Sequence, residues 1–174
     1  MISLQDWQQQ GQLESINGQQ IFTRQGGDKN APVLVLIHGF PSASWDWEGM
    51  WQALTARYYV TTHDMLGFGF SAKPTNSRYL IKDQADIFES YLTKLEISDY
   101  HILAHDYGDT VAQELLARQV EGSSKLRIAS VCFLNGGLFP ETHKPILIQK
   151  LLLSPVGPLI SKLITKQKFS ASLH

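Results

Sequence analysis

The chain has little cysteine, little net charge and no long apolar run, and each of these scarcities excludes some classes of protein. It has one cysteine, Cys132, in 174 residues, which excludes an internal disulfide framework and fits a reducing compartment. Its formal charge is only −1, so it lacks the basic surface that nucleic acids and anionic membranes attract. It has no long unbroken apolar run, because two lysines and two prolines interrupt the stretch 146–164.

The remaining composition is that of a compact soluble protein. With 43% hydrophobic and 18% charged residues, the chain can bury a core of useful size. Its first ten residues have neither a basic start nor an apolar stretch, so we expect no signal peptide and a cytoplasmic location. Cys132 lies inside an apolar run at 128–134, which predicts a core position and not a reactive thiol.

Apolar runs alternate along the chain with stretches of helical spacing. Asn17 and Gly18 separate two short strand-like segments, which predicts a β-hairpin with a type I′ turn. Further strands are predicted at 32–37, 58–62, 100–103 and 128–134, and helices at 47–57, 80–95 and 110–119. This alternation predicts a mostly parallel sheet with an N-terminal hairpin and helices on both faces. After Pro140 the pattern changes to short amphipathic helices, which predicts a boundary there.

A carboxylate stands at the apex of a predicted strand–turn–helix, in the sequence AHDYG at 104–108. Small residues two before and two after Asp106 allow the tight turn of a nucleophile elbow, usually written G-x-S-x-G. Asp106 takes the place of the serine. An aspartate before a helix is also a common N-cap, and Asp109 is expected to stabilise the helix start through the helix dipole.

Two more motifs follow the preceding strands. HGFP at 38–41 comes after the strand 32–37, where an ordinary loop is the simpler interpretation of the motif by itself. DMLGFGFS at 64–71 comes after the strand 58–62 and lacks the third glycine of a dinucleotide fingerprint, so it is predicted to be a structural turn. Because the carboxyl ends of parallel strands meet at one edge of a sheet, the three motifs should come together there.

Taken together, these motifs resemble the α/β-hydrolase superfamily, and within it the branch with an aspartate nucleophile, which includes epoxide hydrolases and haloalkane dehalogenases. The runs HGFP, LGFGFS-x-KP, HDYGD-x-VAQELL-x-R and NGG-x-FPETH are similar to the mesoderm-specific transcript family of hydrolases, from about Gly18 to the end of the chain. This resemblance implies an α/β-hydrolase fold. Residues 1–140 would be the N-terminal part of its core and residues 141–174 the start of its helical cap.

The resemblance also implies roles for individual residues. Asp106 would be the nucleophile, and the backbone N–H groups of Phe40 and Tyr107 would form an oxyanion hole. His38 would belong to the motif turn of the active site. Trp45 and Leu138, with the rings of the oxyanion-hole residues, are expected to line a mostly apolar substrate pocket. No cofactor and no metal are expected.

The chemistry of a carboxylate narrows the reaction class. A carboxylate is already ionised at neutral pH, so it can open an epoxide or displace a halide and remain as an alkyl ester. Attack on an ordinary ester would instead give a reactive anhydride, which argues against an esterase. Phe40 and Tyr107 stand where dehalogenases typically carry a halide-binding Asn or Trp, which favours an epoxide hydrolase-like enzyme. A haloalkane dehalogenase-like enzyme and a non-catalytic binding protein of the same fold remain alternatives.

Hydrolysis of the ester requires a histidine base held by an acid, and the family places both after the cap. Epoxide hydrolases also use cap tyrosines as the ring acid, but no tyrosine follows Tyr107 in this chain. We therefore expect the base and acid in a C-terminal part outside this chain. The expected partners are a small apolar molecule and either a second polypeptide with that part or another copy, paired at the open edge of strand 128–134.

Overall fold

The computed structural model of the protein describes residues 2–136. The predicted boundary at Pro140 and the predicted helical cap at 141–174 lie outside these residues and stay predictions. Leu138, a predicted lining residue of the substrate pocket, also lies outside the described residues.

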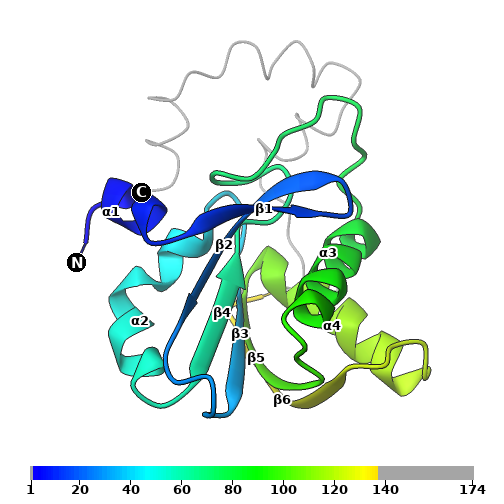
Figure 1. Cartoon of the computed structure of the whole chain (residues 1–174). Coiled ribbons are helices and arrows are strands. Elements are labelled where there is room, and N and C mark those ends of the chain that lie inside the picture. The colour runs from blue at the N-terminus through cyan, green and yellow to red at the C-terminus, as the bar shows by residue number, and fades with distance from the viewer. Residues whose placement is uncertain (1, 137–174) are drawn as a thin grey trace. The chain divides into compact units, whose positions relative to one another are not determined.

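Six strands form one sheet in the order β1-β2-β4-β3-β5-β6 (Figure 1). The strands are β1 Gln12–Ile16, β2 Gln19–Gly26, β3 Val33–Ile37, β4 Tyr59–His63, β5 Asp99–His105 and β6 Arg127–Leu134. The helices are α1 Leu4–Gln9, the 3₁₀ helix η1 Ser44–Trp47, α2 Glu48–Thr55, α3 Ile81–Lys94 and α4 Tyr107–Val120. Strands β4, β3, β5 and β6 run parallel, β2 pairs antiparallel with β4, and β1 pairs antiparallel with β2. The predicted mostly parallel sheet with an N-terminal hairpin is confirmed.

The hairpin forms where the Asn-Gly dipeptide predicted it. Asn17 and Gly18 have φ values of 50° and 76°, and Ile16 pairs with Gln19 across the turn. Two consecutive positive φ angles give the turn a twist that matches the right-handed twist of the strands. The dipeptide therefore sets the register of the first two strands.

Strand β3 is buried on both faces, as its continuous apolar run predicted. Val35 and Ile37 belong to a core cluster that α3 and α4 cover with residues such as Phe88 and Leu115. The alternate residues of β3 belong to a second cluster with side chains from α1, η1 and α2. Figure 1 shows α2 on one side of the sheet and α3 and α4 on the other. Each side chain of this size contributes about 1.5–3 kcal/mol when fully buried.

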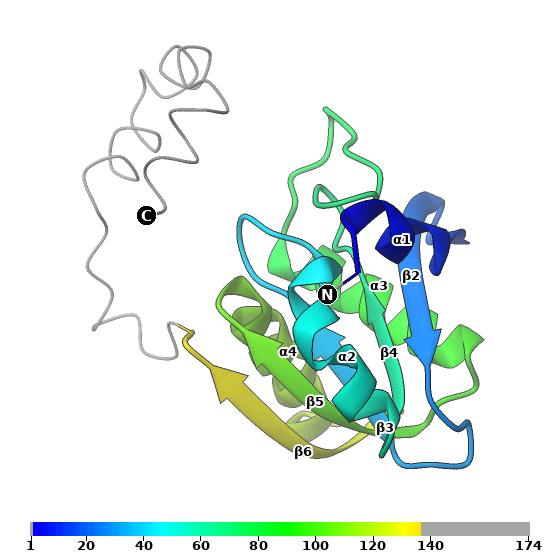
Figure 2. The ribbon, with the colours of Figure 1, turned by 90° about the vertical axis from the view of Figure 1, so that its left-hand side faces the viewer.

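Strand β6 is the outer strand beside β5 (Figure 2), and it is less well covered than the sequence predicted. Ile128 is buried, but Cys132 is exposed and Leu134 is 38% exposed. The prediction that Cys132 belongs to the core is therefore wrong for the described residues. Every second residue of a strand faces the same side, and only one side of β6 packs against α4. The apolar run could not show which side that is.

Two helix limits also differ from the prediction. Helix α1 was not predicted, because it has six residues and only Trp7 is buried. Ser3 starts it with a capping box: the Ser3 hydroxyl accepts the Asp6 N–H at 3.1 Å, and the Asp6 carboxylate accepts the Ser3 N–H. Helix α4 begins at Tyr107, three residues before the predicted start, so the elbow turn leads directly into it.

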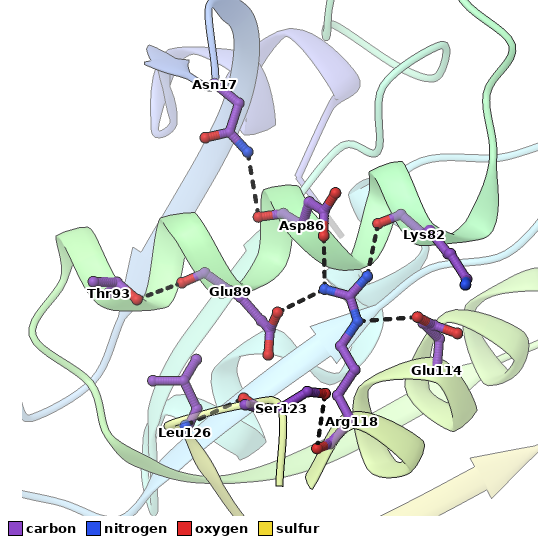
Figure 3. A network of polar contacts seen from close by, with 10 residues as sticks. Asn17, Lys82, Asp86, Glu89, Thr93, Glu114, Arg118, Ser123 and Leu126 are labelled. Atoms are coloured by element: carbon purple, nitrogen blue, oxygen red, sulfur yellow. Dashed lines mark hydrogen bonds and ion pairs between the residues drawn. The ribbon is translucent and has the colours of Figure 1, made fainter. Parts of the chain in front are cut away.

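One arginine connects the helix of the elbow to its neighbour (Figure 3). The guanidinium of Arg118 in α4 donates to Asp86 at 2.7 Å and to Glu89 at 2.6 Å, both in α3. It also donates to Glu114 one turn earlier in α4, at 3.0 Å. These carboxylates raise the pKa of Arg118 against the opposing effect of burial. The network ties the last turn of α4 to α3.

None of the helices within residues 2–136 combines the length and the apolar character that crossing a lipid bilayer requires.

Candidate active site

Asp106 occupies a strained backbone conformation between β5 and α4. Its φ of 53° and ψ of −120° fall in a region that residues other than glycine rarely adopt. The close approach of α4 to β3 explains the glycine two residues later. A Cβ atom on Gly108 would lie 2.5 Å from the carbonyl oxygens of Ile37 and His38. The elbow motif therefore requires a glycine at position 108 for a steric reason.

The Asp106 carboxylate is held by one of its two oxygens. Oδ1 accepts the N–H of Phe40 at 2.7 Å and the N–H of Tyr107 at 2.6 Å. These two donors are the backbone groups that the resemblance assigned to the oxyanion hole. No donor among the described residues forms a hydrogen bond with Oδ2. One oxygen is thus fixed by two backbone donors, whereas the other is available, and the catalytic roles of the three residues stay predictions.

A glycine allows the HGFP loop to approach the elbow. A Cβ atom on Gly39 would lie 2.6 Å from the Cβ of Asp106 and 2.9 Å from its Oδ1. Contacts this short do not occur between real Cβ atoms and their neighbours, so any larger residue would push the loop away. The N–H of Phe40 reaches Asp106 only because residue 39 has no side chain.

His38, predicted in the motif turn, is buried and fully engaged by backbone groups. Its Nδ1 lies 2.9 Å from the carbonyl oxygen of Gly39, and its Nε2 accepts the N–H of Met65 at 3.0 Å. This pattern requires a neutral ring with the proton on Nδ1. Burial lowers the pKa of His38 and favours the same form. His38 therefore ties two loops together, and neither of its nitrogens remains for proton transfer.

The glycine-rich motif after β4 is a structural turn, as predicted. Asp64 is buried at its start and accepts the N–H of Ser44 on Oδ1 at 2.8 Å and the N–H of Phe70 on Oδ2 at 2.7 Å. Gly69 has a φ of 45°, and a Cβ atom there would lie 2.0 Å from the Asp64 carboxylate. The Lys73 ammonium donates to three carbonyl groups of the same turn.

Three aromatic rings, those of Phe40, Phe68 and Tyr107, lie near one another beside the elbow. The ring of Phe68 lies 6.2 Å from that of Phe40 and 6.0 Å from that of Tyr107. Phe40 is 61% exposed and Trp45 is 39% exposed. Phe68 was not among the predicted site residues, although its position in the glycine-rich motif was a signal for it. The enclosed apolar pocket stays a prediction, because Leu138 lies outside the described residues.

A histidine–aspartate pair, which the sequence did not reveal, lies next to the elbow. The Nε2 of His105 is 3.0 Å from Oδ2 of Asp46 in η1, and it also accepts the N–H of Gly39 at 3.3 Å. The hydrogen bond with Asp46 raises the pKa of His105, against the effect of burial. The sequence placed His105 only in the motif turn. No motif marked Asp46.

A second aspartate is buried in the first turn of α4. Burial raises the pKa of Asp109 to about 6, and the nearby backbone of Leu134 and Gly136 offsets part of that rise. Within residues 2–136, no donor meets either carboxylate oxygen of Asp109 with normal hydrogen-bond geometry. The predicted stabilisation of the helix start by the Asp109 carboxylate is therefore only one of two effects at this residue. Its desolvation opposes that stabilisation.

The described residues contain no group of three or more His, Cys, Asp or Glu side chains placed to hold a metal ion.

Comparison with known proteins places this geometry in a family context. Residues 32–154 match the family described as alpha/beta hydrolase fold. The mesoderm-specific transcript protein of Mus musculus is 44% identical to this chain in an alignment 179 residues long, which covers 98% of this chain and 53% of the mouse protein. The chain thus spans about half the length of the curated relatives it matches.

Solved structures show the same fold. The haloalkane dehalogenase DbeA from Bradyrhizobium elkani is 25% identical with a TM-score of 0.65, covering 72% of this chain and 41% of that one. The epoxide hydrolase VrEH1 from Vigna radiata is 22% identical with a TM-score of 0.67, covering 81% of this chain and 44% of that one. The predicted α/β-hydrolase fold is therefore confirmed.

Proposed function

Because the chain belongs to the alpha/beta hydrolase fold family, we propose that it carries the nucleophile of a hydrolase that forms an alkyl ester on Asp106. The observation that supports this most is the asymmetry of the Asp106 carboxylate. Oδ1 accepts two backbone N–H groups, and Oδ2 accepts none from the described residues. A structural carboxylate would be expected to use both oxygens, as Asp64 does.

The first chemical step follows from that asymmetry. A lone pair of Oδ2 attacks a saturated ring carbon of an epoxide, and the bond from that carbon to the ring oxygen breaks. The electron pair passes to the ring oxygen, which then takes up a proton. Asp106 is left as a neutral alkyl ester whose carbonyl oxygen is Oδ1. No base is needed, because a carboxylate, unlike a hydroxyl group, does not have to lose a proton when it attacks.

The two backbone donors act in the second step. When water attacks the ester carbonyl carbon, negative charge develops on Oδ1, to which the N–H groups of Phe40 and Tyr107 already donate at 2.7 and 2.6 Å. Removal of one such donor typically lowers the rate about 10²- to 10³-fold. The N-terminus of α4 adds a favourable dipole at the same place.

The base for the second step is not supplied by the histidines that surround the described site. Both nitrogens of His38 are engaged by backbone groups, and His63 is fully buried with a pKa lowered by burial to about 3. Nε2 of His105 is already engaged by both the Asp46 carboxylate and the N–H of Gly39. We therefore propose that the base and its acid lie in a C-terminal part of the whole protein.

An epoxide remains the proposed substrate class, because neither Phe40 nor Tyr107 has a side chain suited to bind a halide at its position. The likeness to the dehalogenase DbeA favours an alkyl halide as the second candidate. Both substrates would give an ester on the same oxygen. They differ in what leaves, which is an alkoxide that needs a proton or a halide that does not.

The test is covalent labelling of the whole chain. A strained, activated epoxide at high concentration should add once to Asp106, and the adduct should persist, as intact-mass and peptide mass spectrometry would show. Asp106→Asn should abolish it, and Asp28→Asn, at an exposed loop aspartate, should not. Cys132 is exposed, so its thiol should be blocked beforehand.

The labelling pattern decides between the candidates. An alkyl halide of the same carbon skeleton that labels Asp106 faster than the epoxide would favour dehalogenation. Equal labelling of many carboxylates, or labelling unchanged in Asp106→Asn, would favour the non-catalytic binding protein.

We also propose that the exposed edge of β6 pairs with a second polypeptide or another copy. In the described residues β6 pairs only with β5, and its Leu134 and Cys132 are exposed. Size-exclusion chromatography with mass detection tests this directly. A well-folded monomer of 19.6 kDa would contradict it.

A further inference from the structure

Two consecutive residues of the elbow bind two consecutive N–H groups of the HGFP loop. The N–H of Gly39 donates to Nε2 of His105 at 3.3 Å, and the N–H of Phe40 donates to Oδ1 of Asp106 at 2.7 Å. Because the two donors belong to adjacent peptide groups, a movement of one changes the geometry of the other. The hydrogen bond at His105 therefore helps to place the donor at Asp106.

The same nitrogen of His105 has a second partner that it cannot serve at the same time. Nε2 lies 3.0 Å from Oδ2 of Asp46. To accept the Gly39 N–H, Nε2 must carry a lone pair, whereas to pair with Asp46 it must carry a proton. One ring nitrogen cannot do both. The Gly39 contact thus requires the neutral tautomer with its proton on Nδ1, whereas the Asp46 contact requires a proton on Nε2, which the cation always carries.

We propose that His105 is a positioning residue whose protonation state controls the strength of the hydrogen bond from the N–H of Phe40, in the HGFP loop, to Asp106. This role rests on the proposed function of Asp106. As a neutral ring with its proton on Nδ1, His105 holds the Gly39 N–H and thereby keeps Phe40 in place. As a cation it donates from Nε2 to Asp46 instead. The Gly39 N–H then loses its acceptor, and the hydrogen bond from Phe40 weakens.

Charged groups from every neighbouring element act on this equilibrium. Asp46 from η1, Asp106 at the elbow and Asp109 in α4 all favour the cation, and they raise the pKa of His105 against burial. His38, at the end of β3, is neutral and would repel the cation only if it were protonated. The ring of Trp47, 5.1 Å away, packs on His105 without charge.

The direction of the pH effect follows from these contacts. The raised pKa means that the pair of cationic His105 with Asp46 is favoured at acidic pH and is lost as the pH rises through that pKa. The Gly39 hydrogen bond shows the opposite dependence. The hydrogen bond from Phe40 to Asp106 should therefore be strongest above the pKa of His105 and weakest below it.

Nuclear magnetic resonance tests this without any reaction. In ¹H–¹⁵N spectra recorded from about pH 5 to pH 8, the amide resonances of Gly39 and Phe40 should shift with one midpoint, equal to that of the His105 ring. His105→Gln should remove that midpoint, because the amide does not titrate. Asp46→Asn should lower the midpoint. His101→Gln, on the same strand but bonded to Ser130, is the matched control and should leave it unchanged.

A labelling experiment then connects the hydrogen bond to reactivity. An alkyl halide probe is used, because halide departure requires no proton and has no acid dependence of its own. The rate of Asp106 labelling should fall roughly 2- to 10-fold below the midpoint in the wild type, because the N–H of Phe40 then holds the carboxylate less firmly in its attacking orientation. It should fall much less in His105→Gln.

The outcomes separate the two ideas. If the resonances titrate together but Asp106 is never labelled, the proposed nucleophile is wrong and the His105 contact stands. If Asp106 is labelled but Gly39 and Phe40 show no midpoint in common with His105, the positioning role is overturned. A midpoint that persists in His105→Gln would overturn it as well.

Discussion

Asp64 and Asp106 each follow a parallel strand directly, and each accepts two backbone N–H groups, yet they are bound differently. Asp64 uses one oxygen for Ser44 and the other for Phe70, and it is fully buried. Asp106 uses Oδ1 for both of its donors and is only partly buried. The residue type and the place in the fold are the same. The distribution of donors over the two oxygens is what differs.

That difference separates a structural carboxylate from a candidate nucleophile. With both oxygens bonded, Asp64 holds a turn together and has no oxygen to offer a substrate. With one oxygen bonded twice, Asp106 keeps a fixed orientation, and its other oxygen accepts no hydrogen bond from residues 2–136. A glycine stands against each carboxylate, Gly69 at Asp64 and Gly39 at Asp106, so substitutions can be matched across the two sites.

The largest effect on stability is expected from Asp64→Asn. An amide cannot accept hydrogen bonds on both of its ends, so the N–H of Ser44 or Phe70 would face an NH₂ group in the interior. We expect the free energy of unfolding to fall by about 2–3 kcal/mol, measured by urea denaturation. Asp106→Asn should lower it by less than about 1 kcal/mol, because that side chain is partly solvated. Equal losses at the two positions would remove the distinction.

A smaller effect is expected from alanine at the two matched glycines. Gly69→Ala puts a side chain at a φ of 45° and 2.0 Å from the Asp64 carboxylate, and should lower the free energy of unfolding by about 1–2 kcal/mol. Gly39→Ala should mainly displace the N–H of Phe40 and slow labelling of Asp106. Thermal denaturation and labelling rates would be measured on both variants. The comparison fails if Gly39→Ala labels Asp106 at the wild-type rate.

The smallest effect concerns Asp109, a third carboxylate near the elbow. Its pKa is raised from an ordinary 3.8 to about 6, so the folded state holds the proton more tightly than the unfolded state. Stability should therefore decrease as the pH rises from about 4 to 6. Asp109→Asn removes that loss and should raise the free energy of unfolding at pH 7 by about 1 kcal/mol, with no gain at pH 4. A variant less stable than wild type at pH 7 would indicate a bonded carboxylate.

Local patterns in the sequence were sufficient to locate the main elements of the fold. Continuous or turn-flanked apolar runs located the strands, the Asn-Gly pair set the hairpin, and the spacing around Asp106 located the elbow. The two donors to Asp106 came from the resemblance to the α/β-hydrolases, in which each is a backbone group at a set position in a motif. Helix α1 and the outer face of β6 were not predictable, since a six-residue helix carries little periodicity and an apolar run does not show which of its faces is covered.

Only the tertiary structure decided which side chains meet at the ends of the strands and which of them are buried. His105 meets Asp46, Phe68 packs between Phe40 and Tyr107, and Asp109 loses its contact with water. These partners come from different loops, and their contact depends on the register of the parallel strands and on the side of the sheet that each loop crosses. Spacing along the chain carries no information about either. The unequal bonding of the two Asp106 oxygens within the described part of the chain has the same origin, because a donor reaches a carboxylate oxygen only after distant segments have packed together.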